Sequence, residues 1–239
     1  MYNESDLHIE EHYTDTHGYT EINFAAFAMF GKQFSPRIKG VHKQSIYRID
    51  PDKDYGALSV LVNPKNRSIN MDSITSQWDR MGHFYASLEQ GHVTASTALK
   101  RLNAYTPKNE FYRANREFGR VFKTAHILKF MSDKQTRSNI TRGLLKSEQL
   151  HQLARDLKYA KRGRITSRDM VEHMNSCSCL TLILAAIIYW QAKEIHRVLA
   201  QHPQHTDLDL SLLKHVSPIT WDNVILYGEY LIDKGWIRL

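Results

Sequence analysis

The stretch His12–Gly31, HYTDTHGYTEINFAAFAMFG, decides how the chain begins to fold. Residues 7–14 (LHIEEHYT) have the pattern of a short strand, and Asp15 follows it directly. Gly18 then turns the chain, and Thr20 is placed to cap a helix over INFAAFAMF. Asp15 has two interpretations: a turn residue that accepts from nearby backbone N–H groups, or a carboxylate that holds a metal or substrate at a strand end. Local pattern alone favours the turn.

Two further short strands are predicted after this helix. FSPRIKG (residues 34–40) and SIYRID (residues 45–50) both have strand composition, with a turn between them. A strand, a helix and then strands again are typical of an α/β sheet. The opening of the chain therefore predicts an α/β fold.

The segment 50–70 predicts a loop, because it is rich in Pro, Asn, Asp and Gly. Its first residues, DPDKDYG (Asp50 to Gly56), resemble the start of a calcium-binding loop. The Gly comes one position late, however, and position twelve is Leu61 where such loops have Glu. We therefore interpret the segment as a polar loop.

From Ile74 onward the pattern predicts helix after helix. The expected helices cover residues 74–90, 94–105, 109–131, 140–160, 167 to about 202, and 219–233. Thr166 and Asp169 form a capping box before the fifth. Ser217 and Pro218 form an N-cap and first-turn pair before the last.

The totals describe an ordinary globular chain with a basic excess. The 239 residues carry a net charge of +7, which fits an anionic partner such as nucleic acid.

The two Cys, Cys177 and Cys179, point to different sides of a helix, so we expect small buried residues in a reducing compartment. The apolar run 179–190 is too short to span a bilayer and predicts a core helix. The polar, acidic start shows no secretory signal, so a cytoplasmic protein without a membrane partner is expected.

Two Glu residues could carry chemistry. Glu148, in the helix predicted over 140–160, shares a face with His151 and Arg155. The opposite face is the better candidate for the core; it carries Leu150, Leu153 and Leu157. Pattern alone favours a solvated Glu148.

Glu194 shares a face with apolar residues and predicts partial burial. A salt bridge with Arg197 or Lys193 is its simplest explanation.

Basic residues cluster in two stretches with aromatic residues between them. RANREFGR places its three Arg along one side of a helix, and KYAKRGRITSR spreads five cations over a turn and a helix start. Such a mixture suits phosphate contacts with base stacking, and equally an ordinary solvated surface. Known phosphate-loop, zinc-protease, serine-hydrolase and zinc-finger motifs are missing from the sequence.

Several long blocks resemble the C-terminal part of transposases of the Tn-three family, the replicative transposases of bacterial unit transposons. The blocks include HYTDTHGYTEINFAAFAMFGKQFSPRIKG, FYRANREFGRVFKTAHILKFMSD, RGLLKSEQLHQLARDLKYAKRGRI and NSCSCLTLILAAIIYWQAKEI. They occur in the family's order, and the resemblance runs from about residue 7 to the end.

The resemblance implies a ribonuclease-H-like catalytic domain in which two Asp and one Glu hold two divalent metal ions, expected to be Mg2+. Asp15, in TDTHG, matches the second Asp. Glu148, in KSEQLH, matches the Glu, with Glu194 as the alternative. The implied partner is DNA, with self-association as in transposase assemblies, and His17 and His151 are expected at phosphate oxygens. The residues expected to hold DNA are Arg113, Arg116, Arg142, Lys146, Arg155, Lys161, Arg162 and Arg164.

The chain departs from the family pattern at its start. The first Asp of the family belongs to a strand well before TDTHG, and Asp6 is too close to Asp15 to replace it. We therefore expect a C-terminal transposase fragment, a partial ribonuclease-H-like α/β fold that is mostly helical and inactive alone. The alternatives are a DNA-binding remnant that inhibits a full-length transposase, and a plain helical structural protein. The expected divisions are a remaining core part (1–50), a loop with a helical insertion (51–135), helices closing the core (136–202) and a helical tail (203–239).

Overall fold

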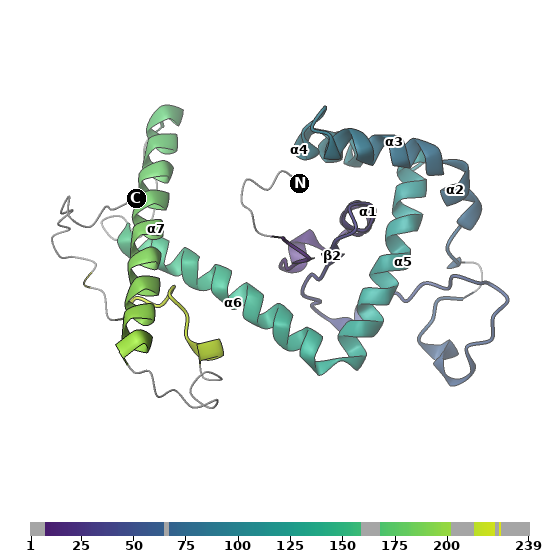
Figure 1. Cartoon of the computed structure of the whole chain (residues 1–239). Coiled ribbons are helices and arrows are strands. Elements are labelled where there is room, and N and C mark those ends of the chain that lie inside the picture. The colour runs from purple at the N-terminus through teal and green to yellow at the C-terminus, as the bar shows by residue number, and fades with distance from the viewer. Residues whose placement is uncertain (1–7, 65–66, 159–167, 202–212, 223–224, 226–239) are drawn as a thin grey trace. The chain divides into compact units, whose positions relative to one another are not determined.

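The computed structural model describes residues 8–64, 67–158, 168–201, 213–222 and 225. The chain divides into two compact units, Met1–Leu144 and Leu145–Leu239. Figure 1 traces the elements along the chain.

A parallel strand pair opens the first unit. β1 (Glu11–His12) pairs with β2 (Gln33–Phe34), with Glu11 opposite Gln33 and His12 opposite Phe34. The ladder continues beyond these residues, because Arg37 N–H donates to the Thr14 carbonyl at 2.8 Å. The predicted first strand therefore forms, and its paired part ends next to Asp15.

The predicted strand-to-helix turn is also confirmed. A short 3-10 turn, η1 (Thr16–Gly18), follows Asp15, and α1 (Glu21–Met29) follows Thr20. The Thr20 side chain caps α1 by accepting from Asn23 N–H. Gly31 takes a positive φ of 64° just after the helix, which glycine tolerates without strain.

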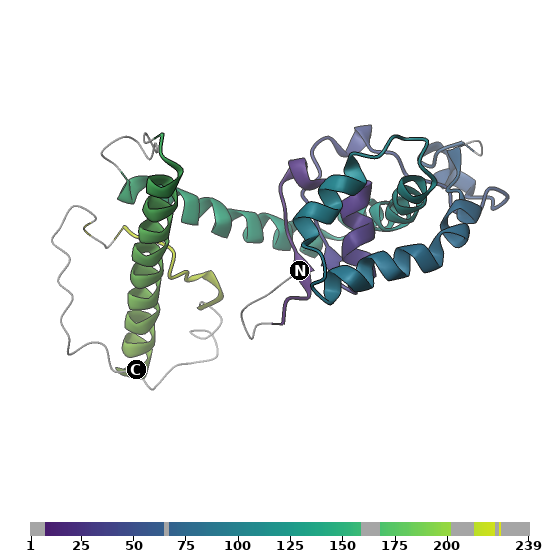
Figure 2. The same ribbon diagram turned by 90° about the horizontal axis from the view of Figure 1, so that it is seen from above.

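Four further helices follow α1 in the first unit. They are α2 (Met71–Ser76), α3 (Trp78–Glu89), α4 (Ala95–Asn103) and α5 (Glu110–Ser132). One buried cluster joins α1, α3, α4 and α5 through Ile22, Met81, Leu102, Phe111 and Ala114. Figures 1 and 2 show α1 and α5 side by side from two directions. Burial of this cluster makes α1 the central helix of the unit.

Gly119 lets α5 approach α1 very closely. A Cβ placed on Gly119 would lie 1.8 Å from the backbone carbonyl oxygen of Glu21. Real Cβ atoms do not come this close to a carbonyl, so the position requires glycine. The contact fixes the start of α1 against the middle of α5.

The prediction of a strand at 45–50 is wrong. Ile46 forms only an isolated parallel bridge with Val62. The neighbouring backbone groups bond elsewhere: Tyr47 N–H donates to the Thr124 hydroxyl at 3.1 Å, and the Arg48 carbonyl accepts from Ile69 N–H. Because the segment is tied to α5 and to the following loop, it does not extend the sheet.

The loop predicted over 50–70 is confirmed in its described part. One 3-10 turn, η2 (Val41–Lys43), precedes the loop, and another, η3 (Gly56–Val60), lies within it. Asp50 accepts from Asp52 N–H and Asp54 accepts from Gly56 N–H, which are side-chain turns. These contacts support the interpretation as a polar loop.

The single helix expected over 74–90 is divided. α2 ends at Ser76 and α3 begins at Trp78, with Gln77 between them at φ −114° and ψ 8°. The break changes the helix direction, and both helices contact α5. Packing on α5 therefore overrides the continuous helical pattern of the sequence.

α6 (Lys134–Leu157) begins six residues before the predicted start at 140, because Asp133 caps it. The Asp133 carboxylate accepts from the backbone N–H groups of Gln135 and Thr136, both at 2.9 Å. The Thr136 hydroxyl also donates to this carboxylate, and this hydrogen bond, followed by the two backbone ones, lowers the pKa of Asp133. A charged cap at this point starts the helix.

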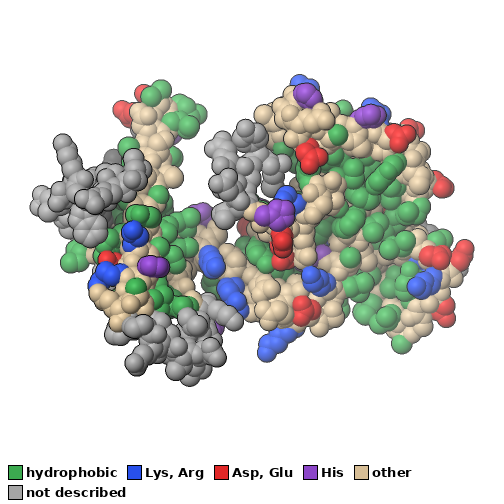
Figure 3. Space-filling model, in the orientation of Figure 1, with side chains coloured by type: hydrophobic (Ala, Val, Ile, Leu, Met, Phe, Trp, Pro, Cys, Tyr) green, Lys and Arg blue, Asp and Glu red, His purple; other side chains and the backbone are tan. Residues whose placement is uncertain are grey.

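The apolar run 179–190 lies in α7 (Met170–Gln201), and the prediction of a buried core helix is wrong. Within the helix only Ile187 and Gln191 are buried, while Leu182 is 71% exposed and Tyr189 65% exposed. Both Cys side chains are exposed as well, contrary to prediction. Within the described part of the second unit no other element makes an extended contact with α7, which leaves most of its apolar side chains unburied. Figure 3 shows hydrophobic side chains at its surface.

By length and composition α7 could cross a membrane, with a mean hydropathy of 1.5 over its most apolar window. Core helices of soluble proteins have the same length and composition, so these two properties do not show whether α7 lies in a membrane. The predicted helix start at Thr166, and most of the helix predicted over 219–233, lie outside the described residues.

The mostly helical α/β class is confirmed, since the described residues hold a two-stranded parallel sheet and α1 to α7. The likeness to ribonuclease H stays a prediction.

Candidate metal and DNA site

Asp15 lies at the carboxyl end of β1 and is exposed. Its Oδ1 atom accepts from His17 N–H at 3.0 Å, so the carboxylate is the N-cap of η1. The turn interpretation of this residue is therefore confirmed. A carboxylate that caps a turn at a strand end is also accessible to a ligand, so the two interpretations are compatible.

The strand face that carries Asp15 also carries Glu11 and Tyr13, because alternate residues share a face. The Glu11 carboxylate accepts from the Tyr13 hydroxyl at 2.7 Å, from Gln33 Nε2 at 2.6 Å and from the Ser35 hydroxyl at 2.5 Å. Burial, and secondly the bond to Glu11, raises the pKa of Tyr13 to about 12. This polar cluster fixes the strand that leads to Asp15.

Tyr13 also contacts the part of α6 that belongs to the first unit. A Cβ placed on Gly143 of α6 would lie 2.6 Å from Cδ2 of Tyr13. The ring and the helix backbone are therefore in close contact, and only glycine leaves room for it. Glu148 lies five residues further along the same helix.

Glu148 is exposed on α6, as are His151 and Arg155. On the other face Leu153 is fully buried, which confirms the predicted division of this helix into polar and apolar faces. Asp15 belongs to the first unit and Glu148 to the second, and each is placed within its own unit.

Glu194, the alternative carboxylate, has an intramolecular partner. Its Oε2 atom lies 2.7 Å from Arg197 Nη2 and accepts from Arg197 Nε at 2.9 Å. This is the salt bridge expected from the sequence. The pairing favours Glu148 over Glu194 as the carboxylate that is accessible to a ligand.

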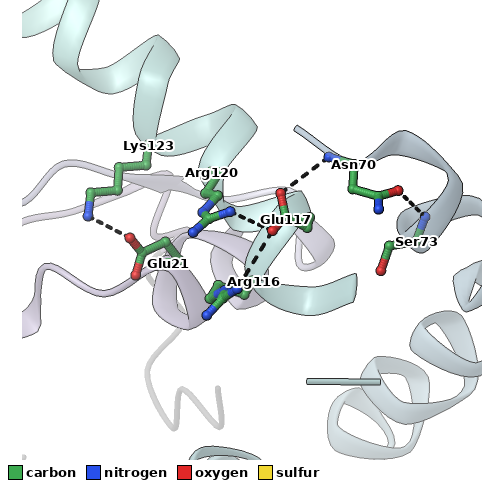
Figure 4. Close-up of polar contacts among 7 residues, drawn as sticks. All are labelled: Glu21, Asn70, Ser73, Arg116, Glu117, Arg120 and Lys123. Atoms are coloured by element: carbon green, nitrogen blue, oxygen red, sulfur yellow. Dashed lines mark hydrogen bonds and ion pairs between the residues drawn. The ribbon is translucent and has the colours of Figure 1, made fainter. Parts of the chain in front are cut away.

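Two arginines of the basic cluster on α5, Arg116 and Arg120, lie next to an acidic residue of the same helix, Glu117 (Figure 4). Glu117, only 7% exposed, accepts from Arg120 Nη1 at 2.5 Å and lies 3.9 Å from Arg116. It also accepts from Asn70 N–H at 3.3 Å, which holds the start of α2. The predicted DNA contact Arg116 thus belongs to a structural network, whereas Arg113 is exposed.

A second ion pair joins α5 to α1, between Lys123 Nζ and Glu21 Oε1 at 2.9 Å (Figure 4). Burial alone would raise the pKa of Glu21, but the hydrogen bond and charge of Lys123 outweigh it and lower that pKa. The Lys123 ammonium also lies 4.3 Å from the ring centre of Tyr19. Sequence reasoning missed Glu117 and this pair. The i, i+3 spacing of Glu117 and Arg120 was an available signal, whereas Glu21 and Lys123 lie 102 residues apart and gave no local signal.

Of the remaining predicted DNA contacts, three lie on α6 and three lie outside the described residues. Arg142, Lys146 and Arg155 are exposed along α6. The other three lie outside the described residues: Lys161, Arg162 and Arg164. Sequence reasoning also overlooked exposed cations in the segment Arg37–Lys43, RIKGVHK, where the signal was the absence of any acidic residue.

The ligand atoms at the proposed metal site are carboxylate oxygens, the type of ligand that hard divalent cations bind. Asp15 and Glu148 are accessible carboxylates, and Mg2+ prefers such oxygen ligands. Across the described ranges, no group of three or more His, Cys, Asp or Glu side chains gathers. The residues placed here thus supply fewer than the three carboxylates that the resemblance implies.

Comparison with known proteins defines the class as DDE-type transposase. A family model described as the Tn3 transposase DDE domain matches residues 1–230, so the chain belongs to this family. The transposase of transposon Tn21 from Escherichia coli is 35% identical over 97% of this chain, and that of Tn1546 from Enterococcus faecium is 33% identical over 96%. The transposase of Tn501 from Pseudomonas aeruginosa is 34% identical over 97%. In each case the chain spans 23% of the relative's length.

Proposed function

We propose that this chain is a C-terminal part of a DNA transposase, in which Asp15 and Glu148 are two of the carboxylates that hold divalent metal ions. The observation that carries the proposal is the family match over residues 1–230 together with the exposed Asp15 at the end of a parallel strand. The family implies a divalent metal in general, and the carboxylate donors favour Mg2+. Bound metal ions stabilise the attacking and leaving oxygens of an in-line phosphoryl transfer.

The chain's own residues would position the DNA. Asp15 is fixed by the η1 turn and by the Glu11–Tyr13 cluster on its strand. The exposed cations Arg142, Lys146 and Arg155 would contact phosphate oxygens along α6. In an intact transposase such a site would nick transposon ends and join them to target DNA, within a ribonuclease-H-like fold. We place the protein in the bacterial cytoplasm, without a membrane partner and with self-association.

Metal binding tests the carboxylate pair. Titration of the purified chain with Mn2+, followed by electron paramagnetic resonance, should show binding that Asp15→Asn and Glu148→Gln each weaken about tenfold or more. Asp79→Asn and Glu89→Gln, at exposed carboxylates of α3, are matched controls and should leave binding unchanged. Equal losses in controls and test variants would contradict the assignment.

We also propose that the chain has no strand-transfer activity alone, because it contributes only two carboxylates. A nicking assay with transposon-end DNA and Mg2+ should therefore give no product. Robust nicking that Asp15→Ala abolishes would overturn this part of the proposal.

The second candidate function is a DNA-binding remnant that interferes with a full-length transposase. The exposed cations of α6 favour it. Salt-sensitive DNA binding without Mn2+ binding at Asp15 and Glu148 would support this function over the first.

A further inference from the structure

The segment Arg37–Lys43 leaves the sheet at the same end as Asp15. Ser35 N–H donates to the His12 carbonyl at 2.9 Å, and Arg37 N–H donates to the Thr14 carbonyl at 2.8 Å. Arg37 is therefore hydrogen-bonded to the residue directly before Asp15. The segment therefore begins beside the strand end that leads to Asp15.

The backbone of the segment is held in place on its inner side. The Pro36 carbonyl oxygen lies 2.9 Å from His126 Nε2. Because a carbonyl oxygen can only accept a hydrogen bond, His126 Nε2 carries the proton and donates it. Ile38 is 6% exposed and packs with Ile46 and Ile127. Gly40 turns the chain with a φ of 67°, and Lys43 N–H closes the turn on the Gly40 carbonyl at 2.9 Å. A fixed backbone presents its outward side chains with little loss of entropy on binding.

Those outward side chains are cationic, and within the described ranges none of them has an ion-pair or hydrogen-bond partner. Arg37, Lys39 and Lys43 are exposed. No acidic residue occurs between Glu21 and Asp50 in the sequence. The ion pairs found among the described residues use other cations, such as Arg120 and Lys123. Phosphate binding at Arg37–Lys43 would therefore break no ion pair between described residues, whereas at Arg116 it would compete with Glu117.

We infer that Arg37, Lys39 and Lys43 form a phosphate-binding loop that holds the DNA backbone next to Asp15. The inference rests on the proposed function, because it takes DNA as the partner. It adds a contact surface on the first unit that sequence reasoning did not assign. The chemistry is a charge-assisted contact with non-bridging phosphate oxygens, without base recognition.

Salt-dependent DNA binding tests the loop. The full chain and a triple variant, Arg37→Gln with Lys39→Gln and Lys43→Gln, are compared by fluorescence anisotropy on a labelled duplex at several salt concentrations. The matched control removes the same charges elsewhere on the unit, by Arg101→Gln with Lys100→Gln and Lys108→Gln, all exposed. If three phosphate contacts are lost, the slope of log K against log salt should become less negative by about 2 to 3. Affinity at 0.1 M salt should fall about tenfold or more in the loop variant, and much less in the control.

The outcomes separate the two proposals. If the unmodified chain binds DNA and both triple variants change the slope equally, net charge explains the binding and only the loop assignment fails. If the unmodified chain binds no DNA, the DNA-binding part of the proposed function fails together with the loop. Sodium phosphate that displaces DNA more strongly than sodium chloride at equal ionic strength would indicate a free-phosphate site and overturn the backbone assignment. Equal thermal melting of the two triple variants shows that neither result comes from unfolding.

Discussion

Two glycines leave room for close packing in the first unit. Gly143 touches the Tyr13 ring, and Gly119 touches the Glu21 carbonyl. Neither glycine has the positive φ that usually explains this residue in turns, so the reason is space rather than backbone conformation. A helical sequence pattern does not show which glycine is needed for space, since Gly82 of α3 has no atom within 4 Å of a Cβ position.

Replacing Gly143 by Ala should destabilise the first unit by about 1–3 kcal/mol, because the new methyl group overlaps the Tyr13 ring. Gly82→Ala is the control and should be neutral or stabilising by about 0.5–1 kcal/mol. Urea unfolding measures both. The double variant Tyr13→Ala with Gly143→Ala should lose less than the sum of the two single variants. Strict additivity would contradict the contact.

At the scale of elements, the contact between α1 and α5 organises the first unit. Gly119, the Glu21–Lys123 pair and the cluster around Ile22 all lie along it. The cap at Thr20 predicted α1, and the helical patterns predicted α4 and α5, nearly to their ends, because capping residues and periodicity are local properties. The division of 74–90 at Gln77 was not predictable, because it depends on two helices meeting a third.

Gly119→Ala should disrupt this packing, at a cost of about 3 kcal/mol, because the backbone carbonyl of Glu21 cannot rotate away as a side chain could. Thermal unfolding monitored by near-ultraviolet circular dichroism measures the loss. Gly82→Ala again serves as the helical control. A melting temperature within 1 °C of that control (roughly 0.2 kcal/mol) would rule out the close contact.

The Glu21–Lys123 pair should make the unit sensitive to acid. The pKa of Glu21 is lowered in the fold, so the pair stabilises above the ordinary pKa of this group, 4.5, and is lost as the pH falls through the lowered pKa. Lys123→Met should cost about 2 kcal/mol at neutral pH and move the acid unfolding midpoint upward.

Arg197→Met removes the exposed partner of the partly buried Glu194 and is the control for the acid experiment. It should leave the acid midpoint unchanged, because exposed ion pairs are screened by solvent. An acid midpoint that is the same in the Lys123→Met variant and the wild type would contradict the role of the Glu21–Lys123 pair.

At the scale of the whole molecule, the buried hydrophobic clusters lie in the first unit. The four clusters found among the described residues draw on positions 22–127. We therefore expect the fragment 1–157, which keeps α6 whole, to unfold cooperatively within about 5 °C of the complete chain. Differential scanning calorimetry of the two proteins measures this. A fragment that melts without a cooperative transition would show that residues beyond 157 are required for the core.

The sequence by itself determined what depends on neighbours along the chain. It placed the strand end at Asp15, the cap at Thr20, the polar and apolar faces of α6, the Glu194–Arg197 pair and, through its ordered motif blocks, the transposase family. Only the tertiary structure decided that Glu117 forms ion pairs with Arg116 and Arg120. It also decided that residues 45–50 do not join the sheet and that most of the apolar run of α7 is not buried. The physical reason is that burial and ion pairing are properties of pairs of surfaces. A pattern along one segment states what that segment can bury, and the segment packed against it decides what is buried.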